Sequence, residues 1–344
     1  MKRHSRPALS GRSPAPSAHD VARLAGVSQA AVSRAFSPGG SISDATRAKV
    51  LQAAQQLGYR PNLLARSLIT GRSGIIGVVI GNPRNPFFLE ALDALSRRMS
   101  RAGRHLLVFT AGADDDADHL VEDLLKFRVD SLVLMSATLS SGLAERCASE
   151  GIPVIFFHRR SRLSGRYASV TGANRVGAGR VAAHLIEQGY RKPAYMAGLE
   201  NSSTSRERES GFVGELAAAG LPRPPKAFGN YDRAGAFVAA RRLLTLQPRP
   251  DAIFCANDMM ALATIEIARH EFGLDIGREL GVAGFDDIEG ACWPSFSLTT
   301  YSQPIEAMIE KVSEIILAPD EGTDLPHIRV EGELKVRNST CRKG

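Results

Sequence analysis

The stretch Asp20-Val-Ala-Arg-Leu-Ala-Gly-Val-Ser-Gln-Ala-Ala-Val-Ser-Arg-Ala35 predicts two short helices separated by a tight turn. Ser17 precedes the first helix at the position of an N-cap, and Ser28 does the same for the second. Between them, Gly26 can adopt the left-handed backbone conformation that ends a helix. Apolar residues recur at helical spacing, at Val21, Leu24 and Ala25 and then at Ala31, Val32 and Ala35.

The opposite face of the second predicted helix carries side chains of another kind. It presents Gln29, Ala30, Ser33 and Arg34. Two helices joined by a tight turn form the helix-turn-helix unit, whose second helix enters the major groove of DNA. Three of the four side chains are polar, and each is short enough to lie against base edges or long enough to reach them. The stretch therefore predicts an all-α DNA-reading head.

Positive charge is concentrated in residues 1–72, which hold eleven Lys and Arg side chains against Asp20 and Asp44. Their net charge is +9, whereas the whole chain carries +7, so the remaining residues carry −2. A basic head on a nearly neutral body indicates that the head meets a polyanion. Residues 1–16 are rich in Pro, Ser and Arg without periodicity, which predicts a disordered basic arm.

A third helix is predicted over about residues 44–57 and ends at Gly58. Its apolar positions are expected to close a three-helix core. They are Ala45, Ala48, Val50, Leu51 and Ala54. We therefore assign residues 17–60 to a helix-turn-helix domain.

Residues 61–73 are assigned as a hinge helix and linker. Leu64, Ala65 and Leu68 share one helical face, but so short a helix is unstable alone in water. We expect it to form only on DNA and against a second copy of itself. An apolar face on the minor groove can then wedge a base step open.

From residue 74 onward, strand-like apolar runs alternate with helical patterns in two successive series, which predicts βα units and parallel sheets. The expected strands are 75–80, 106–109, 132–135, 154–157, 194–197, 227–228, 252–255, 282–285 and 328–330. The expected helices are 86–102, 116–127, 140–149, 175–188, 205–219, 232–246, 258–271 and 304–317. The fold class is thus an all-α head followed by an α/β core of two doubly wound parallel-sheet lobes.

The core, residues 74–344, is expected to bind an effector and to dimerise. Its N-lobe takes about residues 74–173 and 303–327, and its C-lobe takes about 174–302 and 328–344. A ligand is expected between the carboxyl ends of the strands of the two lobes.

Several classes of protein are excluded by what the sequence lacks. The four cysteines are widely separated and the eight histidines show no metal spacing, so neither a metal site nor a cofactor is expected. Apolar runs reach only strand length, which argues against a membrane span. The charged N-terminus has no apolar run behind it, which argues against a secretory signal and favours a cytoplasmic protein.

Two rival functions share the lobed architecture. An enzyme would need a catalytic motif, but the stretch Gly172-Ala-Asn-Arg-Val-Gly-Ala-Gly179 has Ala178 and Gly179 where a P-loop requires Lys and Ser or Thr. A periplasmic solute-binding protein would need a signal peptide and would have no DNA-reading head. We therefore expect a protein that is not an enzyme.

A series of motifs resembles those of the LacI/GalR (lactose-repressor) family of transcription regulators, from about residue 17 to about residue 340. They lie in order at 20–28, 32–34, 57–62, 65–68, 77–79, 85–88, 250–261, 282–287 and 298–304. The resemblance implies a core like a periplasmic binding protein. It also implies a repressor that binds a pseudo-palindromic operator as a homodimer and responds to a small-molecule effector, a sugar or related metabolite. Inducers and corepressors both occur in the family.

The resemblance also assigns DNA contacts. Gln29 and Ala30 occupy the positions that vary the choice of half-site, and Arg34 is a third reader. This agrees with the bidentate pairing of Gln with adenine and of Arg with guanine. The residues placed for phosphate contacts are Ser28, Ser33, Thr46, Arg47 and Asn62. Ala65 and Leu68 belong to the hinge, and Leu68 matches a leucine that wedges into the central base step.

For the effector cleft, the resemblance implies eight lining residues. They are Phe88, Asn174, Thr204, Arg208, Tyr231, Asn257, Asp286 and Gln303. An Arg and an Asp that face a small polar ligand can hold hydroxyls or a carboxylate, and an aromatic ring can stack on it. Asp286 could instead cap a turn, and Phe88 could instead belong to the core. The family often has Asp-Asn where this chain has Ala173-Asn174, which argues against an ordinary sugar held by two acids.

Overall fold

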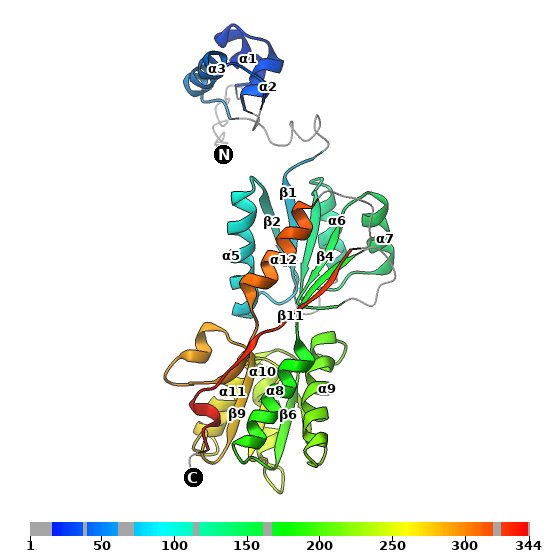
Figure 1. Ribbon diagram of the computed structural model, residues 1–344, viewed down its shortest axis with the longest axis vertical. Helices are drawn as coiled ribbons and strands as arrows, with labels where there is room; N and C mark the ends of the chain where they lie inside the picture. Colours follow the sequence, from blue (N-terminus) through cyan, green and yellow to red (C-terminus); the bar gives the residue numbers. More distant parts are fainter. Residues whose placement is uncertain are drawn as a thin grey trace, which may run out of the picture. The chain divides into compact units, whose positions relative to one another are not determined.

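A computed structural model describes residues 16–36, 40–60, 72–112, 117–160, 167–318 and 325–342. The chain divides into two compact units, Met1–Ser73 and Gly74–Gly344 (Figure 1). Among the helices that the structure describes, none combines the length and the apolar character needed to cross a membrane.

The first unit contains three helices, α1 (Ala18–Ala25), α2 (Gln29–Ala35) and α3 (Asp44–Leu57). Serine side chains cap all three, and Ser17 forms a reciprocal capping box with Asp20 at the start of α1. Gly26 and Gly58 end α1 and α3 with φ of 65° at each, the left-handed conformation that the sequence predicts. The two helices and turn of the helix-turn-helix therefore form as expected.

The core of this unit is smaller than the sequence indicates. Val21, Val32 and Val50 are at most 1% exposed and pack together. The expected core positions Leu24 and Leu51 are instead 50% and 45% exposed. Ala45 and Ala48 are exposed as well, and Ala53 is buried in their place. Helical spacing identified an apolar stripe on α3 but placed it too far around the helix.

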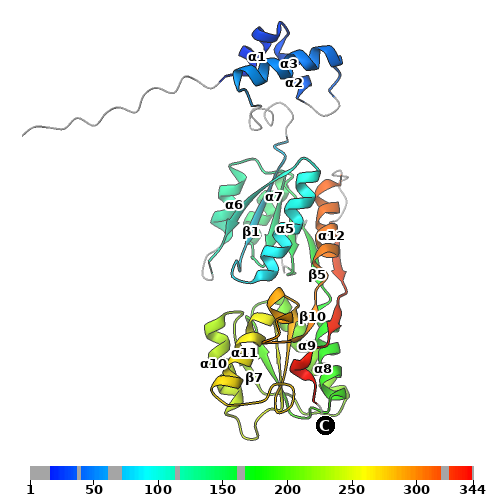
Figure 2. The ribbon, with the colours of Figure 1, turned by 90° about the vertical axis from the view of Figure 1, so that its left-hand side faces the viewer.

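The second unit holds two six-stranded sheets. The first has the order β11-β5-β4-β3-β1-β2, and all its neighbours are parallel. Its strands are β1 (Ile75–Ile80), β2 (His105–Thr110), β3 (Ser131–Met135), β4 (Val154–Phe157), β5 (Ala168–Gly172) and β11 (His327–Val330). Helices α5 (Pro86–Arg101) and α12 (Ile305–Leu317) contact each other, and α6 (Ala117–Leu125) and α7 (Ser141–Ser149) complete the lobe (Figure 2).

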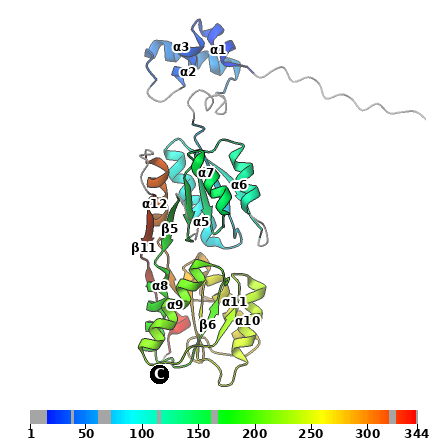
Figure 3. The ribbon, with the colours of Figure 1, turned by 90° about the vertical axis from the view of Figure 1, so that its right-hand side faces the viewer.

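The second sheet has the order β12-β10-β9-β8-β6-β7 and is parallel except for the antiparallel edge strand β12. Its strands are β6 (Pro193–Ala197), β7 (Lys226–Phe228), β8 (Ala252–Cys255), β9 (Gly281–Asp286), β10 (Thr299–Ser302) and β12 (Glu333–Lys335). The helix pair α8 (Asn174–Glu187) and α9 (Ser203–Ala218) packs together, as does the pair α10 (Arg233–Leu244) and α11 (Asp258–His270) (Figure 3). Two short 3-10 helices, η1 (Glu289–Cys292) and η2 (Asn338–Thr340), follow β9 and β12.

The fold class is therefore confirmed, but the last part of the chain is arranged differently from the expectation. The strand expected at 328–330 was assigned to the C-lobe, yet β11 pairs with β5 in the first sheet. The chain passes to the second sheet only after Val330, where β12 pairs with β10. The alternating burial of β11 is typical of an edge strand, and that pattern does not indicate which of two sheets the strand joins.

Three strands were not expected from the sequence. β5 reads Ala-Ser-Val-Thr-Gly, which contains no long apolar side chain although all five residues are buried. β10 reads Thr-Thr-Tyr-Ser, in which Tyr301 is the single large side chain, and β12 is only three residues long. Small and hydroxyl residues fill a strand between two covering layers without producing the strong apolar run that identifies a buried strand.

Candidate functional site

The first candidate surface is the exposed face of α2. Ser28 caps this helix, and its Oγ accepts a hydrogen bond from the amide of Ala31 at 3.2 Å. Ala31, Val32 and Ala35 are buried as predicted. All four residues predicted for the outward face are exposed: Gln29, Ala30, Ser33 and Arg34. The helix therefore presents polar and small side chains on a face that the rest of its own unit leaves open.

Arg47 on α3, which is predicted to contact a phosphate, also makes hydrogen bonds within its own unit. Its guanidinium donates to the carbonyl of Ala35, which ends α2, and to the carbonyl of Gly40 at 3.0 Å. The side chain therefore holds the end of α2 and the following loop against α3. Thr46 forms a hydroxyl bond of 2.8 Å with the N-cap Ser43.

Three further residues predicted to contact DNA, Asn62, Ala65 and Leu68, fall in the segment 61–71. That segment lies outside the described residues.

The second candidate site lies between the two sheets of the second unit. Asp286 ends β9, Asn257 follows β8, and His158 follows β4, so all three stand at carboxyl ends of parallel strands. In open α/β sheets, ligands bind at this edge. Ten residues line the space: Asn82, Asn85, Phe88, Ser136, His158, Arg159, Arg208, Tyr231, Asn257 and Asp286. The space is closed in this form, because it leaves only about 10 Å³ for a water-sized sphere.

Arg208 of α9 is at the centre of this cleft and is fully buried. Its Nη2 lies 3.5 Å from Oδ1 of Asp286, and its Nε donates to Oδ1 of Asn174 at 2.9 Å. Nη1 donates to the carbonyl of Ala256, and Nη2 lies 3.1 Å from Nε2 of His158. The guanidinium also stands 3.8 Å from the ring centre of Phe285.

Asp286 connects the two lobes. Oδ2 accepts a hydrogen bond from Asn85 of the first lobe at 3.3 Å, and Oδ1 accepts one from Gln303 at 2.7 Å. Burial raises the pKa of this carboxyl, and the Arg208 cation and the hydrogen bonds oppose the rise. The residue has φ of 122°, a conformation that favours glycine. A non-glycine residue in such a conformation with three polar partners indicates a functional constraint, not a simple turn cap.

Five of the eight predicted effector residues line the space: Phe88, Arg208, Tyr231, Asn257 and Asp286. The other three bond to residues that line it. Asn174 bonds to Arg208, Gln303 bonds to Asp286, and Thr204 lies 3.3 Å from the hydroxyl of Tyr231. Phe88 is both a lining residue and a core residue, since it is 2% exposed and its ring packs edge-on to Phe87.

Sequence reasoning missed His158 and Arg159. His158 is buried with φ of 72°, and burial with the neighbouring Arg208 cation holds its pKa well below the usual value. It is therefore neutral, and its Nε2 accepts from Arg208. Both residues follow the predicted strand 154–157 directly. The rule that ligands bind at carboxyl ends of strands would have identified them.

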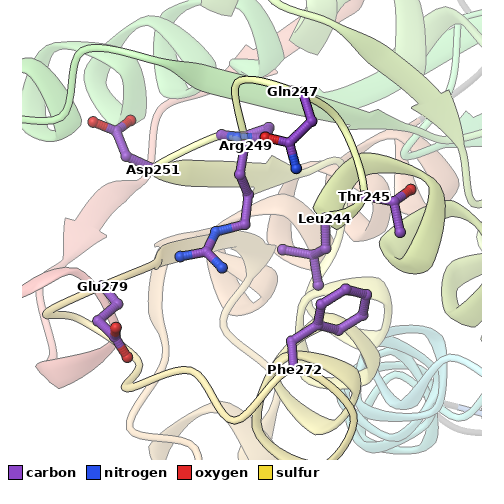
Figure 4. A pocket seen from close by; sticks show the side chains of 8 residues that line it. Leu244, Thr245, Gln247, Arg249, Asp251, Phe272 and Glu279 are labelled. Carbon is purple, nitrogen blue, oxygen red and sulfur yellow. The ribbon is translucent and has the colours of Figure 1, made fainter.

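A larger hollow of about 510 Å³ lies at the opposite, amino ends of β8 and β9 (Figure 4). Arg249 occupies its middle, with Asp251 and Glu279 on one side and Leu244 and Phe272 on the other. We do not assign it as the effector site despite its size, because ligands of open α/β sheets bind at the carboxyl ends of the strands and this hollow lies at the amino ends. Within the described part of the chain, His, Cys, Asp and Glu side chains form no cluster that could hold a metal ion.

Comparison with known proteins identifies a family for both units of the chain. Residues 17–62 match the model of bacterial regulatory proteins of the lacI family. Residues 73–318 match the model of periplasmic binding proteins and the sugar-binding domain of the LacI family.

Individual relatives match over almost the whole chain. The HTH-type transcriptional repressor PurR of Aliivibrio salmonicida is 30% identical, over 87% of this chain and 90% of its own. The HTH-type transcriptional regulator CelR of Thermobifida fusca is 29% identical, over 98% of this chain and 100% of its own. A solved lac repressor dimer bound to operator and the anti-inducer ONPF superposes with a TM-score of 0.83 at 26% identity. The match covers 94% of this chain and 99% of the lac repressor chain.

These relatives are transcriptional regulators and not enzymes, which confirms the expectation that this chain is not an enzyme. A capped recognition helix, two parallel-sheet lobes and matches to both family models occur together in one chain. The chain therefore belongs to the lacI family of bacterial regulatory proteins and is a DNA-binding transcriptional regulator.

Proposed function

We propose that the chain is a repressor that binds a pseudo-palindromic operator as a homodimer and responds to a small polar metabolite held between its lobes. The observation that carries the proposal is the buried Arg208–Asp286 pair, in a chain that also presents an open recognition helix. The similar lac repressor was solved as a dimer on its operator with an anti-inducer. As a DNA-binding regulator, the protein acts in the cytoplasm, at the nucleoid.

In this proposal the head reads DNA in three ways. Gln29, Ala30 and Arg34 face base edges in the major groove. Phosphates are contacted by Ser28, Ser33, Thr46, Arg47 and Asn62, and Arg47 also holds the end of α2 in place. Ala65 and Leu68 lie at the minor groove, where Leu68 separates the central base step.

In this proposal the cleft between the lobes controls DNA binding. Its closed form depends on Asn85 of one lobe reaching Asp286 of the other, with Arg208 beside it. A ligand that binds one lobe arrangement better than another shifts the population between them. Phe88, Tyr231 and Asn257 would complete the contacts to that ligand. Hydrogen bonds from three further residues would hold the lining side chains in place: Asn174, Thr204 and Gln303.

Selection of bound duplexes from a random library tests the DNA-reading role. The full-length protein should enrich an inverted repeat, and Gln29→Ala should relax preference at one position of each half-site. The expected loss is about 1–3 kcal/mol of discrimination at that base pair. Gln56→Ala, an exposed glutamine on α3, is the matched control and should leave the selected sequence unchanged.

Two results would contradict the proposal. One is enrichment of no inverted repeat by the wild-type protein. The other is a loss of affinity in Gln29→Ala that is equal for selected and random duplexes, because a base-reading residue affects selected sequences more.

A further inference from the structure

The cleft holds more positive than negative charge. Arg159 and Arg208 both line it, whereas Asp286 is the one acidic residue among its lining residues. Asp286 lies 3.5 Å from Arg208, and among the described residues no carboxylate forms an ion pair with Arg159. Arg159 is partly buried, and this burial and the nearby Arg208 cation lower its pKa, which is the direction expected for a partly buried cation without a counter-charge.

Two acidic groups of the second lobe that lie near cleft residues in the sequence are already engaged. Asp258 accepts hydrogen bonds from Thr300 at 2.6 Å and from the amide of Ile288 at 3.0 Å. Glu207 accepts from Asn174 at 3.1 Å. Neither acid lines the cleft, so neither balances Arg159.

The enclosed polar atoms that lack a partner are mostly donors. Nε of Arg159 and Nδ2 of Asn257 have no hydrogen-bond acceptor among the described residues. Nδ1 of His158 is also without a partner, and it carries the ring proton because Nε2 accepts from Arg208. A buried donor without an acceptor costs free energy, so three in one cleft indicate that an acceptor-rich ligand belongs there.

We propose that the effector carries an anionic group, a phosphate ester or a carboxylate, and that Arg159 binds this group between the lobes. The proposal rests on the function proposed above and defines the chemical class of its effector. His158 and Asn257 supply further donors, and Asp286 remains available to accept from hydroxyls of the same ligand. Because the closed cleft has room for about one water, the ligand enters only when the lobes separate.

Thermal unfolding in sodium phosphate, acetate and chloride, at one pH and one ionic strength, tests the proposal without knowledge of the natural effector. Wild-type protein is compared with Arg159→Met and with Arg160→Met. Arg160 is the exposed neighbour of Arg159, so Arg160→Met is the matched control. Phosphate stabilises folded proteins non-specifically, so the measured quantity is the Tm difference between wild type and each variant in each salt.

We expect phosphate or acetate to raise the Tm of wild type and of Arg160→Met by about 2–4 °C relative to chloride. Arg159→Met should lose this rise. In chloride it should melt no lower than wild type, because an unpaired enclosed charge has been removed. A rise in phosphate alone identifies a phosphate ester, and a rise in acetate alone identifies a carboxylate.

Equal salt responses in wild type and Arg159→Met would overturn the proposal, and so would a lower Tm of Arg159→Met in chloride. Binding of the selected duplex is measured alongside, and all three proteins should bind it equally without added anion. If a neutral sugar releases the duplex from wild type and Arg159→Met alike, the anionic class is wrong although the proposed function stands. If wild type binds no duplex, the proposed function itself fails.

Discussion

The recognition helix and the effector cleft present their polar side chains in opposite ways. On α2, Gln29 and Arg34 are exposed, and the helix is fixed by caps and a small apolar core beneath it. In the cleft, Arg208 is 0% exposed and is bonded to four other residues. A surface built for a large partner can stay open and hydrated. The cleft instead encloses its polar side chains among one another.

This difference has an energetic consequence. An exposed reader costs little when it has no partner, because water satisfies it. A buried charge costs several kcal/mol unless it is paired, as Arg208 is with Asp286. We therefore expect substitutions of this pair to affect folding, and those on the outward face of α2 to affect binding alone.

The largest effect is expected for Arg208→Met. Removing this guanidinium leaves Asp286 buried without its cation, which typically costs about 3–5 kcal/mol. Denaturant unfolding of the full chain should show that loss in the transition of the Gly74–Gly344 unit, while the head unfolds as in wild type. Arg223→Met, which removes an arginine that is 77% exposed, is the control and should change stability by less than about 1 kcal/mol.

Adding Asp286→Asn to Arg208→Met tests whether the loss of the ion pair causes the destabilisation. If the lost ion pair accounts for the effect, the double variant should be more stable than the sum of the two single losses predicts. Strict additivity would mean that Arg208 stabilises the lobe by packing on Phe285 and not by its charge.

A comparable effect is expected from pH at Asp258, which follows the cleft residue Asn257 in the sequence. Burial raises the pKa of this carboxyl from its usual 3.8 to about 7. The folded protein then holds a proton that the unfolded chain has lost, so stability from this group falls as pH rises from about 4 to about 7. The slope is about 1.4 kcal/mol per pH unit and should disappear in Asp258→Asn.

The stabilities of wild type and Asp258→Asn must be compared at each pH, because His158 changes stability with pH in the opposite direction. Its lowered pKa makes the folded protein less stable as pH falls below about 6.5. Wild type and Asp258→Asn share the contribution of His158, so it cancels in the difference between their free energies of unfolding. A difference that stays constant from pH 4 to pH 8 would contradict the raised pKa of Asp258.

Asp20 in the head gives the smallest effect and the opposite sign. It is partly exposed, and hydrogen bonds from Ser17 lower its pKa. The stability that it contributes is present near neutral pH and is lost on acidification below about 4. Asp20 and Asp258 should therefore respond to acid in opposite directions, as the stabilities of Asp20→Asn and Asp258→Asn relative to wild type, measured at each pH, would show.

Most of the head and much of the cleft could be predicted from sequence. The caps at Ser17 and Ser28 and the outward face of α2 follow from local rules, because a helix terminus and its periodicity are encoded within a few residues. Arg208 and Asp286 were identified through family resemblance, since they lie 78 positions apart in sequence and nothing local connects them.

What failed depends on long-range packing. β5 is built of small residues and is buried only because helices cover the sheet on both faces. The assignment of β11 required knowledge of which lobe supplies its neighbour. The exposure of Leu24 and Leu51 reflects how three helices cross, which their separate periodicities do not specify. The surplus charge of Arg159 appeared only once the cleft was assembled.

The central claim is that a ligand in the cleft controls the grip of the head on DNA. The most direct measurement is the affinity of the full-length protein for its selected duplex, with and without each member of a set of sugars, sugar acids and sugar phosphates. We predict that at least one compound changes this affinity by about 5–150-fold, and that Asp286→Ala abolishes the change while still binding the duplex. An affinity that no compound changes, or a change that persists in Asp286→Ala, would contradict the account.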